Sequence, residues 1–116
     1  MYLVDSTGET ASLVLTKNLP EEFVSEVRTV NTKEKHFYNL FTIGEPIISD
    51  NYSELRPDIA RFGIRSVASI PLVAKDRVIG ALNVGSYRRD EITDQEREIL
   101  ISIGRELGTT ILRMSA

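Results

Sequence analysis

Apolar residues are densest in the second half of the chain, where two apolar runs flank a short polar loop. The runs are Ser66–Ala74 and Val78–Val84, and the loop between them is Lys75-Asp76-Arg77. Both runs are short and interrupted by Pro or Gly, which favours an antiparallel hairpin with a four- or five-residue connection over a helix. Apolar side chains fall on both faces of each strand. The pattern therefore predicts a hairpin inside a sheet, covered on both sides.

The N-terminal third predicts a second hairpin followed by a helix. Tyr2–Asp5 and Glu9–Thr16 have strand-like patterns, and Gly8 lies in the turn between them. A helix is expected to open at Asn18–Glu22, because proline is tolerated in a first turn and carboxylates favour the positive end of the helix dipole. Its apolar stripe follows at helical spacing: Phe23, Val24, Val27 and Val30.

The middle of the chain predicts shorter elements. Thr32 is expected to cap a short helix that carries Phe37, Leu40 and Phe41. Ile47–Ser49 resembles a short strand, and Tyr52–Phe62 is expected to be loop with one or two loose helical turns. These elements connect the two predicted hairpins.

The clearest helix runs from Thr93 to about Met114. Thr93 and Glu96 fit a capping box, and six apolar residues follow in one stripe: Ile99, Leu100, Ile103, Leu107, Ile111 and Met114. The carboxylates of Asp90, Glu91, Asp94 and Glu96 are expected to serve helix capping and not metal binding.

A second group on this helix lies off the stripe and contains two glycines. Its members are Ile101, Gly104, Gly108 and Leu112. Each glycine costs about 1 kcal/mol of helix propensity against alanine. The presence of two glycines therefore indicates that the backbone of another element approaches the helix closely there. Two interpretations stay open, namely tight packing on the sheet and on a further helix outside this sequence, or the seam of a homodimer. Both require a partner surface.

Taken together, the elements predict an α+β fold with a central antiparallel sheet of five or six strands and helices on both faces. The 116 residues form a single domain over 1–116. The formal net charge of −3 and the lack of a basic run argue against a nucleic-acid partner. No apolar run approaches the roughly 20 residues of a membrane span, and the start lacks a signal-peptide pattern, so we expect a cytoplasmic protein without a membrane partner.

Six short segments, in order and at suitable spacing, resemble the GAF domain family, whose fold is related to PAS domains. The segments are Tyr2–Asp5 with Gly8, Gly44–Asp50, Gly63–Ser66, Ile70–Leu72, Val78–Val84 and Asp94–Glu96. The family's usual first helix has no counterpart here. We therefore expect a fragment of a longer signalling protein.

The resemblance implies a sheet with helices of a homodimer bundle on one face and a small-molecule pocket on the other, roofed by Thr32–Phe62. It also implies a non-catalytic sensor that relays a signal to a histidine kinase, a cyclase or phosphodiesterase, or a transcription regulator. The alternative is a ligand-free module for dimerisation or protein interaction. The space beside Asn51 and Ser66 separates the two: an enclosed cavity there favours sensing, whereas a packed interior favours the interaction module.

Several subtypes of the family are excluded, and no cofactor is expected. Bilin attachment and the methionine sulfoxide reductase chemistry of this fold need cysteine, and the chain has none. The cyclic-nucleotide signature of the family is missing. Haem would need His36, the one histidine, and a lone histidine beside aromatic residues is more often a surface or packing residue. No metal site or catalytic constellation can be assembled from the residues, so we expect no enzyme.

The resemblance also places the candidate ligand-binding residues. Asp50, Asn51 and Tyr52 form the best polar cluster, although a strand-terminating turn explains it equally. Ser66, Ser69 and Asn83 are polar residues in apolar strands, where bonds to the backbone are the alternative to a ligand. The expected apolar lining, or else a plain core, comprises Phe41, Ile48, Ile59 and Phe62.

Overall fold

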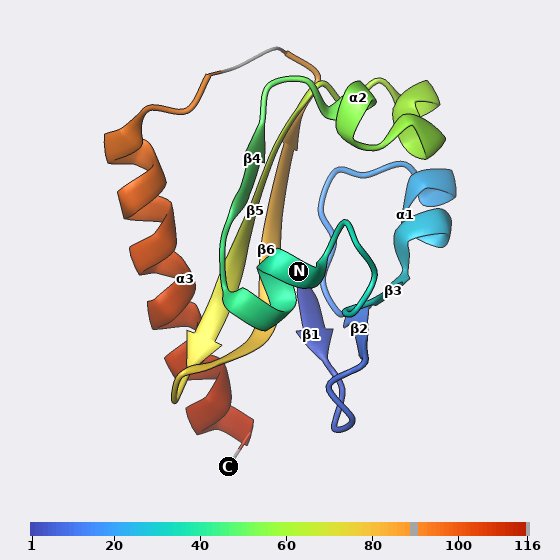
Figure 1. Cartoon of the computed structure of the whole chain (residues 1–116). Helices are drawn as coiled ribbons and strands as arrows, with labels where there is room; N and C mark the ends of the chain where they lie inside the picture. Colours follow the sequence, from blue (N-terminus) through green and yellow to red (C-terminus); the bar gives the residue numbers. More distant parts are fainter. Residues whose placement is uncertain (89–90, 116) are drawn as a thin grey trace.

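A computed structural model describes residues 1–88 and 91–115 of the chain. Within this part, six antiparallel strands form one sheet in the order β3-β2-β1-β6-β5-β4 (Figure 1). The strands are β1 (Tyr2–Val4), β2 (Thr10–Leu13), β3 (Thr29–Asn31), β4 (Ile47–Ser49), β5 (Ser66–Ala74) and β6 (Arg77–Ser86). The helices are α1 (Glu21–Val27), η1 (Asn39–Ile43), α2 (Tyr52–Leu55), η2 (Pro57–Phe62) and α3 (Asp94–Ser115). The predicted α+β fold is confirmed.

The hairpin of β5 and β6 lies inside the sheet, as its two apolar faces predict. Its predicted connection of four or five residues is wrong, because Ala74 pairs with Arg77 and leaves only Lys75 and Asp76 between the strands. Both have left-handed backbones, with φ of 50° and 60°. Two left-handed residues match the twist of adjacent strands, so the strands continue further into the polar loop than its composition indicates.

α3 covers one face of the sheet and packs on β5 (Figure 1). A Cβ atom at Gly104 would lie 2.4 Å from the carbonyl oxygen of Pro71, and one at Gly108 would lie 2.4 Å from that of Val73. The glycines therefore serve close packing of this helix on the sheet. The capping box at its start is confirmed, because Thr93 N–H donates to Glu96 Oε1 and Glu96 N–H donates to Thr93 Oγ1, each at 3.2 Å. Asp90, one of the residues expected to cap, lies outside the described residues.

The opposite face of the sheet is covered by α1, η1, α2 and η2. Two apolar clusters form there. One contains Tyr2, Ala11, Leu40, Phe41 and Ala81. The other contains Phe23, Val27, Ile59 and Ile64. Helices thus lie on both faces of the sheet, as expected. The core on the face opposite α3 is divided into these two clusters.

Two predictions for the N-terminal half are wrong. Val30 was expected in the first helix, but it lies in β3 and pairs with Ala11 of β2. Thr32 was expected to cap a helix, but its buried hydroxyl donates to the carbonyl oxygen of Gly8 at 2.6 Å. In both cases a partner that is distant in sequence determines the conformation.

β1 and β6 are paired over only two residues of each strand. β1 pairs with β2 along its whole length, but it pairs with β6 only through Tyr2 with Ala81 and Leu3 with Gly80. The part of β6 beyond Ala81 has no pairing with β1 in the described sheet. The sheet therefore consists of two parts, β3-β2-β1 and β6-β5-β4, joined over two residue pairs.

Candidate ligand-binding site

A cavity of about 90 Å³ lies on the sheet face opposite α3. Ile70 contacts Gly104 of α3, so the neighbouring residues of β5, whose side chains alternate, point to the other face. Ser69 is paired with Ile47 on one side and with Asn83 on the other, and all three line the cavity. The rest of the floor consists of Tyr2, Leu13, Val67 and Gly85.

The roof of the cavity comes from the helical segments and loops on this face. Its residues are mostly apolar or aromatic: Leu19, Phe23, Val27, His36, Phe37, Tyr52, Leu55, Arg56 and Ile64, and Met1 also borders the space. Predominantly apolar walls with a few polar groups are typical of small-molecule sites.

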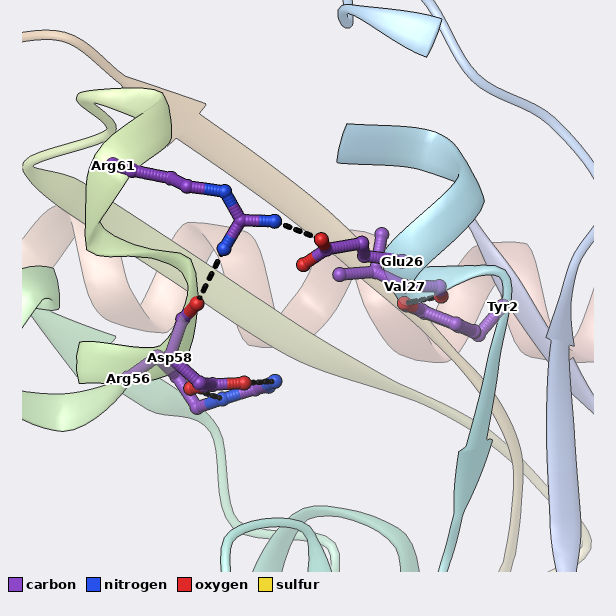
Figure 2. A network of polar contacts seen from close by, with 6 residues as sticks. All are labelled: Tyr2, Glu26, Val27, Arg56, Asp58 and Arg61. Atoms are coloured by element: carbon purple, nitrogen blue, oxygen red, sulfur yellow. Dashed lines mark hydrogen bonds and ion pairs between the residues drawn. The ribbon is translucent and has the colours of Figure 1, made fainter. Parts of the chain in front are cut away.

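Polar and aromatic contacts tie the roof segments together. The guanidinium of Arg61 in η2 donates to Glu26 Oε1 of α1 and, at 2.8 Å, to the carbonyl oxygen of Asp58 (Figure 2). Next to this ion pair, the rings of Phe23 and Phe62 meet edge to face with their centroids 5.3 Å apart. These contacts hold α1 and η2 side by side above the cavity.

Arg56 is the charged residue of the lining. Its Nε and Nη2 atoms donate to the two carboxylate oxygens of Asp58 at 3.0 and 2.8 Å (Figure 2). The guanidinium carbon lies 5.3 Å from the ring centroid of Phe37, and only 16% of the side chain is exposed. The hydrogen bonds with Asp58 raise the pKa of Arg56 and hold the pKa of Asp58 below its usual value. Both groups are therefore charged at neutral pH.

Two tyrosines contribute hydroxyl groups near this arginine. The Tyr2 hydroxyl donates to the carbonyl oxygen of Val27, and burial, with a smaller contribution from Tyr52, raises the pKa of Tyr2 to about 12. Burial also raises the pKa of Tyr52, although the charge of Arg56 opposes this shift. No group in the described part of the chain hydrogen-bonds to the Tyr52 hydroxyl.

Ser69 is the polar residue of the cavity floor. The residue is only 7% exposed, and its hydroxyl has no hydrogen-bond partner among the described residues. Among the described residues every fully buried side-chain nitrogen or oxygen has a hydrogen-bond partner, so the Ser69 hydroxyl is open to the cavity and can bond to water or to a ligand there. This makes Ser69 the most informative residue of the site.

The structure brings together three of the ten predicted site residues. Tyr52, Ser69 and Asn83 line the cavity. Phe41 packs in the cluster with Leu40. Ile59 and Phe62 pack in the neighbouring cluster, close to the cavity but outside its lining.

The other four predicted residues lie elsewhere. Ile48 pairs with Ala68 on the face that α3 covers. The Ser66 hydroxyl donates to the carbonyl oxygen of Arg88 at 2.5 Å. Asp50 and Asn51 border a separate surface hollow, whose other residues are Ser53, Ala60, Gly63, Ile64 and Arg65. A ligand contact for each of the ten residues stays a prediction.

Sequence reasoning missed the residues that form most of the lining. The alternation of strand side chains could have indicated Val67 and Ile47, because they share a face with Ser69 through spacing and register. No local pattern indicates Arg56, since its place above the cavity depends on the packing of α2 and η2.

Residues 1–88 and 91–115 contain no group of three or more His, Cys, Asp or Glu side chains able to hold a metal ion. None of their helices combines the length and the apolar character that a membrane crossing requires.

Comparisons with known proteins agree with this geometry. Residues 1–111 match the family described as GAF domain, while no curated protein matched the chain. Among solved structures, a domain from Sinorhizobium meliloti, in a protein described as a two-component sensor histidine kinase, is 28% identical, with a TM-score of 0.76 over 98% of this chain and 77% of that chain.

Two further structures show the same fold at lower identity. The GAF domain of an Acinetobacter phosphoenolpyruvate-protein phosphotransferase is 21% identical, with a TM-score of 0.75 over 97% of this chain and 68% of that chain. The free methionine-R-sulfoxide reductase of Neisseria meningitidis, solved with its substrate, is 19% identical, with a TM-score of 0.73 over 99% of this chain and 68% of that chain. The fold thus occurs in a protein described as a sensor histidine kinase, in a phosphotransferase and in a reductase. The family match over nearly the whole chain shows that this protein belongs to the GAF domain family.

Proposed function

We propose that this GAF domain is a non-catalytic sensor, which binds a small molecule in the cavity and passes a change to an attached effector through α3. The observation that carries the proposal is the Ser69 hydroxyl, which opens to the cavity and has no partner among the described residues. A ligand that supplies this partner gains affinity from the hydrogen bond to that hydroxyl.

The same strand supports both the cavity and the helix. Ser69 lines the cavity, and the next two residues, Ile70 and Pro71, contact Gly104 of α3 on the opposite face. A displacement of β5 by a ligand therefore acts directly on α3. For signalling, the ligand must bind one arrangement of strand and helix more tightly than the other.

The test is a thermal-shift screen of metabolites against the purified domain and a cavity-filling variant. We expect at least one compound to raise the melting temperature with increasing concentration, because binding to the native state stabilises it. Ser69→Leu fills the cavity and should abolish the shift. Ser25→Leu makes the same change on the exposed side of α1 and should retain it.

Failure of every compound to shift the melting temperature of the unmodified domain would contradict the sensor proposal. That result would favour the second candidate, a ligand-free interaction module. Its specific support is the exposed apolar stripe on α3, which includes Ile99, Ile103 and Met114.

A further inference from the structure

Asn83 and His36 of the lining are exposed and carry both donor and acceptor atoms. Among the lining residues that are at least partly buried, three hydrogen-bond donors lack a partner within the described residues. They are the Ser69 hydroxyl, the Tyr52 hydroxyl and the Nη1 group of Arg56. Ser69 is on the floor, and the other two belong to the roof segment of α2 and the residue that follows it. Among these partly buried residues, the free hydrogen-bonding capacity is therefore concentrated in groups that can donate.

Asp58 fixes the direction of the remaining arginine donors. It accepts from Nε and Nη2 of Arg56 and is itself 60% exposed, so it occupies the solvent side of the guanidinium. The ring of Phe37 lies beside the guanidinium and also lines the cavity. Arg56 is thus held in place with Nη1 unused, and a guanidinium has no acceptor atom.

The neighbouring Tyr2 hydroxyl adds no competing donor, because its hydrogen is directed to the carbonyl oxygen of Val27. Because the remaining set includes the cationic Arg56, it favours a ligand group that accepts hydrogen bonds and carries a negative charge. An ionised carboxylate has two acceptor oxygens, and its hydrogen bonds to arginine are charge-assisted. A ligand ammonium group would be repelled by the positive charge of Arg56. A neutral amide could accept from the same donors, but without the charge-assisted bond to arginine.

The apolar walls and the size of the cavity define the rest of the ligand. Phe23, Val27, Ile64 and Val67 surround the space beside the polar end. A cavity of roughly 150 Å³ is known to hold benzene. At about 90 Å³, this cavity accommodates a smaller body, such as a short aliphatic chain.

We propose that the ligand of this cavity is a short-chain aliphatic carboxylate, whose oxygens accept hydrogen bonds from Arg56, Tyr52 and Ser69. This inference rests on the proposed function, because it specifies the ligand class for the same cavity. Asp58 is a positioning residue in this arrangement, since it touches Arg56 and not the ligand.

The experiment is an NMR titration of the ¹⁵N-labelled domain with sodium butyrate, with butyramide as the neutral isostere and sodium chloride as the salt control. Saturable shifts of amide signals in β5 and α2 are expected with butyrate. Butyramide should bind at least about tenfold more weakly, because it lacks the charge-assisted bond.

Two matched arginine variants test whether Arg56 binds the carboxylate of butyrate. Arg56→Met keeps an apolar stem of similar length and should weaken butyrate binding at least about tenfold. Arg105→Met makes the same change on α3, on the other face of the sheet, where the side chain is exposed and outside the cavity lining, and it should bind butyrate as the unmodified domain does. If Arg56→Met does not fold, Arg56→Lys serves, because it keeps the charge but loses the planar donor geometry and should also weaken binding.

Each outcome bears on one proposal. Equal binding of butyrate and butyramide, or unchanged butyrate binding in the Arg56 variant, overturns the carboxylate assignment while the sensor proposal stands. Absence of any butyrate-induced shift in β5 and α2 also overturns the assignment. If a different metabolite still binds and Ser69→Leu abolishes its binding, the sensor proposal survives without the carboxylate.

Discussion

At the scale of single residues, Tyr2 links parts of the chain that are far apart in sequence. Its side chain is only 5% exposed, packs in the cluster with Ala11 and Phe41, and donates its hydroxyl hydrogen to Val27 at the end of α1. The residue also lines the cavity. From the sequence it was predicted only as a strand residue, because nothing local indicates a hydrogen bond across 25 positions.

Tyr2→Phe should change the alkaline stability of the domain in a defined pH window. Since the folded-state pKa is raised from 10 to about 12, the neutral hydroxyl contributes stability that is complete below pH 10 and is lost as the pH rises towards 12. A shift of this size corresponds to about 2 to 3 kcal/mol. The measurement is the free energy of urea unfolding at several pH values.

The variant should lose about 1 kcal/mol at neutral pH, because the hydrogen bond to Val27 is removed. Between pH 10 and 12 its stability should fall less steeply than that of the unmodified domain. Identical pH profiles of the two proteins would show that Tyr2 does not remain neutral through this window.

Ser66 and Ser69 show how far the alternation of side chains along β5 predicts the site. Ser66 and Ser69 were both predicted to face a ligand, but three positions along a strand reverse the face. Ser69 lines the cavity, whereas Ser66 bonds to the backbone of Arg88. The alternation of strand side chains places Ser66 and Ser69 on opposite faces of the sheet. It does not reveal which of the two faces carries the cavity.

At the scale of elements, those with strong local signals were predicted best. α3 has a capping box and two glycines that serve the helix start and its close packing on β5, whereas Ile99, Ile103 and Met114 of its apolar stripe are exposed. β3 was missed, because its three residues form a strand only through pairing with β2. Short edge strands of this kind carry little signal of their own.

α3 also presents an apolar stripe away from the sheet, and we propose that a second copy of the domain packs there. Ile99, Ile103 and Met114 are exposed on this helix, while Gly104 and Gly108 face β5. Sedimentation velocity over the micromolar to millimolar range should show dimers. Ile103→Glu should shift the population to monomers, because a charge at an apolar seam is costly to bury.

Ser102→Glu is the matched control for this prediction, since it adds the same charge to the neighbouring exposed position of α3. It should leave the dimer intact. A monomeric unmodified domain throughout the concentration range would contradict the proposal, as would equal effects of the two substitutions.

At the scale of the whole molecule, the order of elements made the fold predictable. Each predicted hairpin and helix restricts the partners available to the others, and the central β5–β6 hairpin needs cover on both faces. The cavity could not be predicted in the same way. Its roof combines Phe23, Phe37 and Arg56 from separate segments, so its lining depends on tertiary packing rather than on any periodic pattern.

The two-pair contact between β1 and β6 has a consequence for cooperativity. The part formed by β3-β2-β1 has little backbone pairing to the rest of the sheet, so it can open as a unit below the free energy of global unfolding. Native-state hydrogen exchange should therefore give lower opening free energies for its amides than for those of β5 and β6. Equal values in both parts would contradict this division.

The cavity spans the same boundary. Tyr2 and Leu13 belong to one part of the sheet, and Val67 and Ser69 belong to the other. A bound molecule contacts both parts and so works as a bridge, whose binding free energy is added to the cost of separating them. Occupancy of the cavity should then slow amide exchange throughout β1, β2 and β3. A ligand of this cavity would thus also determine how nearly the sheet behaves as one cooperative unit.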